Sequence, residues 1–299
     1  SAQSAKYDSR NDPIKFDEEG PRSETSPRVF WAKAVQGGYK GATPHAKDDL
    51  EAETIIDLVL DGKHVFLGPQ RKPYIEMGKR HHVLLDSKEF KLYVRDKVYT
   101  GLGKTLSKDA IDTISATIES TIRSDEIVPV ATRCAGHGDN VYLFLADKDH
   151  TVIEIDEHGW RECEDPPVRF VKTDVMEELP KPVPGGSIDD LAQFINFGDN
   201  KDSMLSTLAY LAKMILKPDS ITPALAFQGE KGSGKTFALV HTAMMVDPQS
   251  VLTSAPPKTE TDLVIAACNS YVVSFDNVSN FSAEFSDAIC RLITGGGIK

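Results

Sequence analysis

Residues 229–236 read GEKGSGKT and carry the most informative pattern in this 299-residue chain. They fit the phosphate-binding pattern G-x-x-x-x-G-K-[ST] at every fixed position. A β-rich run, residues 222–228, precedes them, and a helix-permissive run, residues 237–245, follows. Strand, loop and helix is the order that this pattern requires, so the sequence predicts a loop that binds ATP through its phosphates.

The residue types of this loop suit phosphate chemistry. Glycines let successive backbone N–H groups turn inward around the phosphates, where Cβ atoms would not fit. Lys235 is predicted to meet the β- and γ-phosphates, and the Thr236 hydroxyl is predicted to bind Mg²⁺. The predicted nucleotide-binding residues are Gly229, Glu230, Lys231, Gly232, Ser233, Gly234, Lys235, Thr236 and Phe237.

An acidic residue is expected to help the Thr236 hydroxyl hold the magnesium. Residues 270–276, SYVVSFD, are apolar and β-branched and end in Asp276, which we predict to be this second Mg²⁺ ligand. Asn277 follows, where many ATPases carry a glutamate that polarises the attacking water. Lys235, Asp276 and Asn277 are therefore the predicted catalytic residues. The general base stays open, because an asparagine can orient a water but cannot take its proton.

Four nearby acids are candidates for that base, although each is more often a solvated surface residue. They are Glu230, Glu260, Asp262 and Glu284.

The C-terminal motifs resemble a known group of motors. The combination of GEKGSGKT, the FDN at Asp276 and the downstream CRLITGGG resembles the ATPase domain of primase-helicase proteins from phages, plasmids and integrated mobile elements, relatives of superfamily 3 helicases. In that group a turn of the form L-x-T-G-G opens a basic loop that lines a hexamer pore. Leu292, Thr294, Gly295 and Gly296 match that opening.

The resemblance implies an ATP-driven DNA helicase or translocase that acts as a hexameric ring on single-stranded DNA. It also implies an arginine from a neighbouring subunit, which cannot be assigned here; Arg291 is expected to have a solvated or packing role. The chain ends at Lys299 where the pore loop should continue, so it is expected to be a fragment that binds ATP and turns it over slowly. The net charge of −11 opposes nucleic-acid binding, unless positive charge is confined to a pore.

The sequence suggests three regions. Residues 1–47 are predicted to be a polar arm or linker, residues 48–180 an α+β accessory domain, and residues 187–299 a P-loop ATPase core. Alternating strands and helices in the last region predict a largely parallel sheet with helices on both faces, of RecA-like or AAA+ type. In the accessory region, residues 51–60 and 106–122 are predicted to be helices, and residues 82–85, 141–145 and 151–155 to be strands.

Composition predicts a soluble cytoplasmic protein with no membrane partner. No apolar run approaches the roughly 20 residues that span a bilayer. The four cysteines have no C-x-x-C spacing, which argues against a zinc site and against a disulfide framework. His81 and His82 are adjacent, so on a strand they point to opposite faces and cannot share one metal.

Two other function classes stay open. One is an ATP-gated scaffold or regulator of the defence or partition type, which Asn277 keeps possible. The other is a small-molecule or protein kinase on the same loop, against which the chain shows no acceptor-site lid.

Overall fold

The computed structural model describes residues 52–123, 125–197, 201–278, 280 and 282–294. The predicted arm, residues 1–47, lies outside the described residues. The chain divides into two compact units. In the described part, residues 52–61 and 92–114 form the first unit, and residues 62–91 and 115–294 belong to the second.

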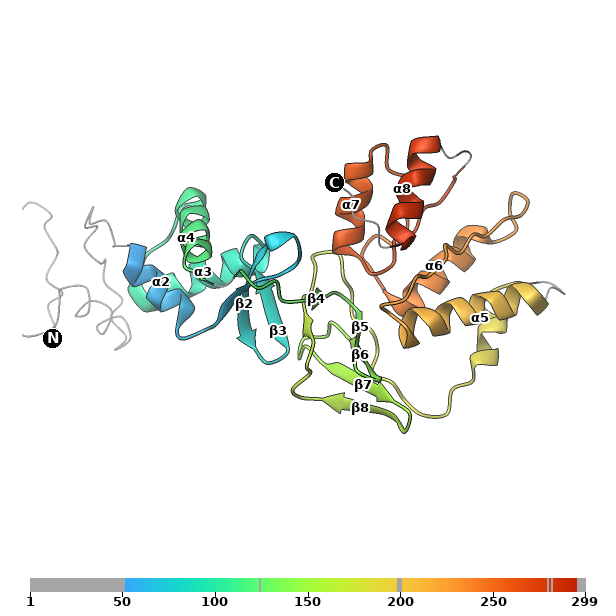
Figure 1. The fold of residues 1–299 in the computed structure, drawn as a ribbon, viewed down its shortest axis with the longest axis horizontal. Coiled ribbons are helices and arrows are strands. Elements are labelled where there is room, and N and C mark those ends of the chain that lie inside the picture. Colours follow the sequence, from blue (N-terminus) through green and yellow to red (C-terminus); the bar gives the residue numbers. More distant parts are fainter. Residues whose placement is uncertain (1–51, 124, 198–200, 279, 281, 295–299) are drawn as a thin grey trace, which may run out of the picture. The chain divides into compact units, whose positions relative to one another are not determined.

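The first unit contains a short helix and parts of two longer ones (Figure 1). Their bounds are α2 Ala52–Leu60, α3 Lys88–Leu102 and α4 Lys108–Ser120. Helix α4 begins two residues after the predicted start at 106, and the Ser107 hydroxyl accepts a hydrogen bond from the Ala110 N–H at 3.2 Å. Ile111, Ile114 and Ile118 are buried on one face of the helix. Ile122, which continues the same spacing and was expected on this stripe, lies beyond the end of the helix and is only partly buried.

Two small antiparallel sheets make up much of the second unit. The first has the order β1-β2-β3, and the second has the order β5-β6-β7-β8. Their strands are β1 Val65–Leu67, β2 Pro73–Gly78, β3 His81–Leu84, β5 Cys134–His137, β6 Asn140–Phe144, β7 Val152–Asp156 and β8 Gly159–Cys163. Strands β4 Val130–Ala131 and β9 Arg169–Phe170 form a parallel pair. A 3-10 turn, Pro69–Arg71, lies between β1 and β2.

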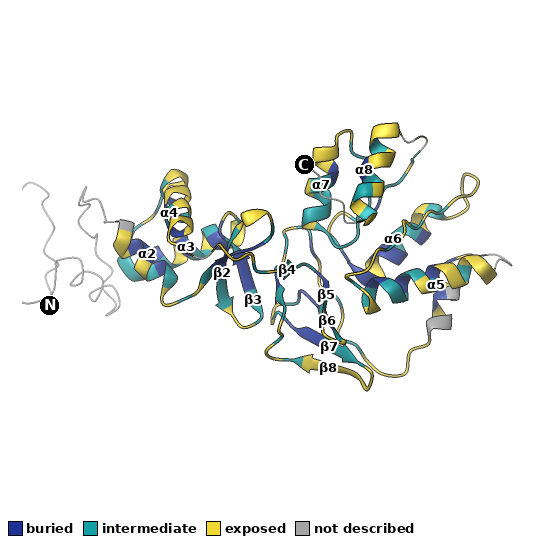
Figure 2. Ribbon diagram, viewed as in Figure 1, coloured by how far each residue is buried: buried dark blue, intermediate teal, exposed yellow. Residues whose placement is uncertain are grey.

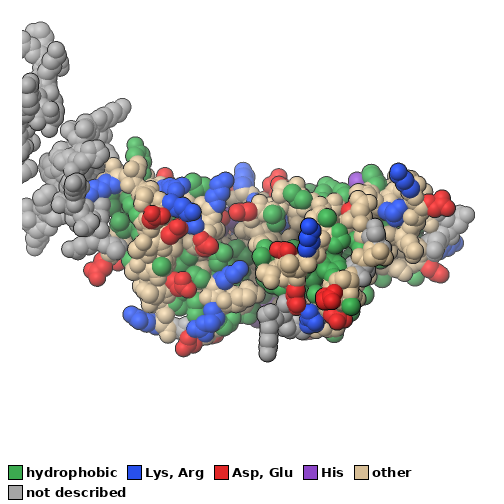
Figure 3. Space-filling model, turned by 90° about the horizontal axis from the view of Figure 1, so that it is seen from above, with side chains coloured by type: hydrophobic (Ala, Val, Ile, Leu, Met, Phe, Trp, Pro, Cys, Tyr) green, Lys and Arg blue, Asp and Glu red, His purple; other side chains and the backbone are tan. Residues whose placement is uncertain are grey.

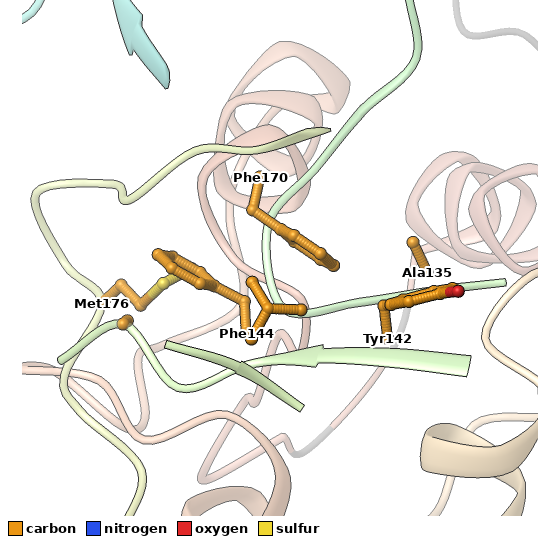
Figure 4. Packing of buried hydrophobic residues seen from close by; sticks show 7 residues of the cluster. Ala135, Tyr142, Phe144, Phe170 and Met176 are labelled. Atoms are coloured by element: carbon orange, nitrogen blue, oxygen red, sulfur yellow. The ribbon is translucent and has the colours of Figure 1, made fainter. Parts of the chain in front are cut away.

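One face of the four-stranded sheet carries an aromatic core. The Phe144 and Phe170 rings stack with centroids 5.4 Å apart, and Met176 packs beside them (Figure 4). Tyr142 and Ala135 extend this core along β6 and β5. Strand β8 remains mostly exposed at the sheet edge (Figure 2). The strands predicted at residues 82–85, 141–145 and 151–155 are therefore confirmed to within one residue at each end.

The C-terminal part of the second unit is mainly helical. Its elements are the 3-10 helix η2 Ile188–Gln193 and the helices α5 Lys201–Leu216, α6 Lys235–Val246, α7 Glu260–Asn269 and α8 Ala283–Thr294. Helices α5 and α6 pack together, and α7 lies beside α8 (Figure 1). The core between α5 and α6 contains Leu211, Met214, Ala238 and Val246. Residues 181–187, at the boundary between the predicted accessory domain and the predicted core, are mostly exposed and lie outside any helix or strand.

The sequence predicts a largely parallel sheet in this region, and the described residues do not contain one. Residues 222–228 form no strand, and the parallel pairing between residues 251–254 and 270–276 is a single bridge, Ser254 to Phe275. Parallel sheets need cover on both faces. Ala224 and Ala226 are exposed, so that cover is missing here. The observed class is mixed α/β with small sheets.

Candidate functional site

The glycine-rich loop ends directly at the first residue of α6. Gly232 and Gly234 have φ angles of 83° and 85°, in the left-handed region that side chains with a Cβ rarely adopt. Gly234 is the residue that precedes the helix, and its carbonyl accepts the Ala238 N–H at 2.9 Å. The first N–H groups of a helix have no partners inside it and can bind an anion. The predicted loop and helix thus lie where a phosphate would meet backbone N–H groups.

Lys235 folds its side chain back over this loop. Its Nζ donates to the Glu230 carbonyl at 2.6 Å and lies 3.5 Å from the Ser233 hydroxyl. Both acceptors are neutral oxygens. A phosphate oxygen is a stronger acceptor for an ammonium group than either of them. The lysine is therefore held at the loop by contacts that a phosphate could replace.

Thr236 and Asp276 are 40 residues apart in the sequence, and the fold brings them together. The Thr236 hydroxyl donates to the Asp276 carboxylate at 2.8 Å. The second carboxylate oxygen of Asp276 accepts the Asn277 N–H, also at 2.8 Å, and the Asp276 N–H donates to the Ser254 carbonyl. Hydroxyl and carboxylate oxygens are ligands that suit Mg²⁺. The two residues fit the magnesium site that the sequence predicts, and its occupation stays a prediction.

Asn277 has a φ angle of 57°, a left-handed conformation that asparagine tolerates better than most residues. The turn that this φ produces lies directly after Asp276. The catalytic role predicted for Asn277 is not tested by this geometry.

The four candidate bases differ in what surrounds them. Glu260 forms an ion pair with Arg291 at 2.7 Å, and both side chains are more than 40% exposed. Asp262 lies in the first turn of α7, where its N–H donates to the hydroxyl of the capping residue Thr259 and its carboxylate accepts from that hydroxyl. The pKa of Glu284 is lowered by a hydrogen bond from its own N–H and by one from Ser282. These contacts give three of the four acids structural partners.

Two of the four residues of the predicted pore turn belong to the described residues, and the other two do not. Leu292 and Thr294 lie in the last turn of α8, where the Thr294 hydroxyl donates to the Cys290 carbonyl at 2.9 Å. Gly295 and Gly296 lie outside the described residues. Arg291 is engaged with Glu260, in line with the structural role expected for it.

Phe237 is the exposed aromatic residue nearest the loop in sequence. Its ring is 48% exposed and stacks on His241 with centroids 3.8 Å apart. An exposed aromatic face next to a phosphate loop can stack on a nucleobase. Glu230, Lys231 and Ser233 are exposed in the loop itself.

The structure contains a buried ion pair, between Arg133 and Asp247, that was not predicted from the sequence. Arg133 and Asp247 are essentially inaccessible to solvent, and Arg133 Nε donates to Asp247 Oδ1 at 2.9 Å. The rest of the guanidinium donates to three backbone carbonyls, of Phe144, Glu177 and Pro248. Every polar side of this arginine is therefore engaged, which burial of a charge requires.

Asp247 connects this ion pair to the helix that carries Thr236 and to the segment that carries Asp276. It directly follows α6, and its Oδ2 accepts the N–H groups of Tyr271 and Val272 at 2.8 and 3.0 Å. The Tyr271 hydroxyl donates to the Met214 carbonyl, and burial raises the pKa of this phenol. The segment that carries Asp276 is thus fastened at its start to the C-terminal end of the helix that carries Thr236.

Charge on the surface is mixed. Figure 3 shows basic and acidic side chains interspersed over the face that it presents. Among the described residues, no helix is both long enough and apolar enough to cross a lipid bilayer.

Comparison with known proteins finds one family that matches this region of the chain. Residues 188–299 match the family described as Actinomycete integrative conjugative element replication protein, and no curated protein or solved structure matches the chain. The matched segment is 112 residues, less than half of the 299. It contains the loop, Thr236 and Asp276. The C-terminal part of this chain is therefore similar to a replication protein of a mobile element.

Proposed function

We propose that residues 188–294 form an ATP-binding module with a phosphate-binding loop, and that this module powers a DNA helicase or translocase in mobile-element replication. The contact between Thr236 and Asp276 carries the proposal, because it joins two residues that the motif assigns to one magnesium ion. The family match supports the setting in mobile-element replication.

In this proposal each residue has a defined task. The loop and the first turn of α6 bind the phosphates through backbone N–H groups. Lys235 turns from the Glu230 carbonyl to the β- and γ-phosphates, and Thr236 and Asp276 hold Mg²⁺, which supplies charge neutralisation on the phosphates. Asn277 orients the attacking water. Single-stranded DNA and a ring of identical subunits are the partners proposed for the complete machine.

A second candidate is an ATP-gated scaffold, in which nucleotide binding switches assembly without fast hydrolysis. Asn277 favours it, because an amide stands where a carboxylate base would follow Asp276. Glu260 pairs with Arg291 and Asp262 accepts from Thr259, so each of these acids already has a partner of its own.

The experiment that separates the two candidates is phosphate release by the full-length protein with Mg·ATP. For a motor, adding a single-stranded oligonucleotide raises the rate severalfold, and double-stranded DNA of the same length raises it less. Tight ATP binding with equally slow release in every condition contradicts the motor and leaves the scaffold.

Replacing Asp276 by asparagine is expected to lower magnesium-dependent turnover far more than nucleotide affinity. The asparagine keeps the shape and can still accept from Thr236, but it lacks the charge that the metal needs. Phosphate release and calorimetric titration on the same preparations measure the two effects. Asp165→Asn is the control, because that carboxylate pairs with Lys79 at 2.9 Å and has no assigned role in turnover. Equal losses of turnover and affinity in Asp276→Asn would indicate a packing role instead.

A further inference from the structure

Three side chains that suit a transition metal meet in the second unit, in a cluster separate from the residues assigned to nucleotide. His81, Glu89 and His150 each offer one ligand atom, and these atoms all lie within 4.8 Å of one another. His81 Nε2 is 2.7 Å from Glu89 Oε1, and the rings of His81 and His150 stack with centroids 3.8 Å apart. They come from β3, from the start of α3 and from the turn between β6 and β7.

Strand β3 and the turn between β6 and β7 bring the side chains of His81 and His150 together. His81 begins β3, and its neighbour His82 turns the other way, is buried, and contacts the Phe170 carbonyl at 3.1 Å through Nδ1. Sequence reasoning is therefore right that adjacent histidines cannot share a metal. It missed that His81 meets a histidine 69 positions later in the chain.

His150 is held in position by its own turn. Its φ angle of 51° is left-handed, and the Asp147 carboxylate accepts both the N–H and the hydroxyl of Thr151 at 2.7 Å. The other side of its ring faces Phe144, with centroids 6.1 Å apart. A ligand fixed by its surroundings loses little conformational entropy when it binds.

Lys172 is the nearby cation that opposes a metal, and its ammonium donates to the Ala146 carbonyl.

We propose that His81, Glu89 and His150 bind one Zn²⁺ ion. Two imidazole nitrogens and a carboxylate oxygen form a known zinc ligand set that leaves a fourth tetrahedral position for water. Bond lengths of about 2.0–2.2 Å place tetrahedral ligand atoms roughly 3.4 Å apart. His81 Nε2 and Glu89 Oε1 therefore move apart from 2.7 Å, and the stacked rings rotate until both imidazole lone pairs point at the ion. The ion would fasten the first turn of α3 to both sheets. This site does not depend on nucleotide binding.

The test is titration of the metal-stripped protein with Zn²⁺ alone, and separately with Co²⁺, at pH 7.5 without nucleotide. The wild-type protein should bind one equivalent, melt at a higher temperature with zinc, and give the visible absorption band of tetrahedral cobalt. His150→Ala should lower the zinc affinity by roughly a hundredfold or more, since even indirect partners of a metal site cost 10- to 100-fold. Glu89→Gln keeps the shape of the side chain and should do the same.

His158→Ala is the matched control, because this histidine is 81% exposed and its imidazole pairs with Glu157 at 3.5 Å. It should bind zinc as the wild type does. Circular dichroism shows whether each variant folds, and if His150→Ala does not fold, Glu89→Gln decides. Failure of the wild type to bind one equivalent of zinc overturns the site. So does undiminished zinc binding by both ligand variants, which would place the metal elsewhere.

Discussion

Replacing Arg133 by methionine is expected to lower the free energy of unfolding by about 3–5 kcal/mol. The substitution fills much of the same volume but leaves the Asp247 carboxylate buried without its cation. Three backbone carbonyls that accept from the guanidinium also lose their donor. A buried charge without a partner costs far more than the pair contributes when complete, so this is the largest stability effect expected in the described residues.

Arg71→Met is the matched control for this measurement. Arg71 also pairs with a carboxylate, that of Asp125 at 2.8 Å, but the two side chains are 62% and 92% exposed. Exposed ion pairs contribute little to stability, so this variant should unfold nearly as the wild type does. Denaturant titration followed by circular dichroism gives both values. Similar small losses in the two variants would show that the Arg133 pair does not hold the fold together.

The amphipathic helices could be predicted from the sequence because their apolar spacing is regular. Ile111, Ile114 and Ile118 have helical spacing, and all three are buried on α4. Helix α3 was missed, although Phe90, Val94 and Val98 recur every four residues and are fully buried. Its tyrosines and valines favour strands by propensity, and the burial of one helical face outweighs that preference.

The strands around the loop were predicted from their residue composition, and composition alone does not determine whether a run forms a strand. Residues 270–276 are β-branched, yet they pair with a neighbouring segment at a single bridge. Whether a β-rich run becomes a strand depends on partners and on cover for both faces, and a single sequence does not give either.

The residues of the candidate site could be predicted more readily than the buried ion pair that fastens its segments together. The motif fixes Lys235 and Thr236, and the apolar run before Asp276 identified the residue that accepts the Thr236 hydroxyl at 2.8 Å. Nothing in the sequence marks Arg133 or Asp247, because the two residues are 114 positions apart and a lone arginine is usually exposed. His150 was missed for the same reason, since only the fold brings it to His81.

Replacing Lys235 by alanine is expected to lower the affinity for Mg·ATP by roughly one to two orders of magnitude while the fold stays intact. A hydrogen bond to a charged group contributes about 1.5–3 kcal/mol, and each 1.4 kcal/mol is tenfold in affinity. The Lys235 ammonium contacts the Glu230 carbonyl and the Ser233 hydroxyl, both in the loop, so its loss removes little packing. Lys231→Ala is the control in the same loop, since the motif uses only the backbone at that position.

Calorimetric titration with Mg·ATP, and with adenosine in place of ATP, tests phosphate recognition by residues 229–236 most directly. The wild type and Lys231→Ala should bind Mg·ATP, adenosine should bind far more weakly because it lacks phosphates, and Lys235→Ala should lose the preference for ATP. Equal affinity of wild type and Lys235→Ala for Mg·ATP, or equal binding of ATP and adenosine by the wild type, would contradict the assignment of this loop.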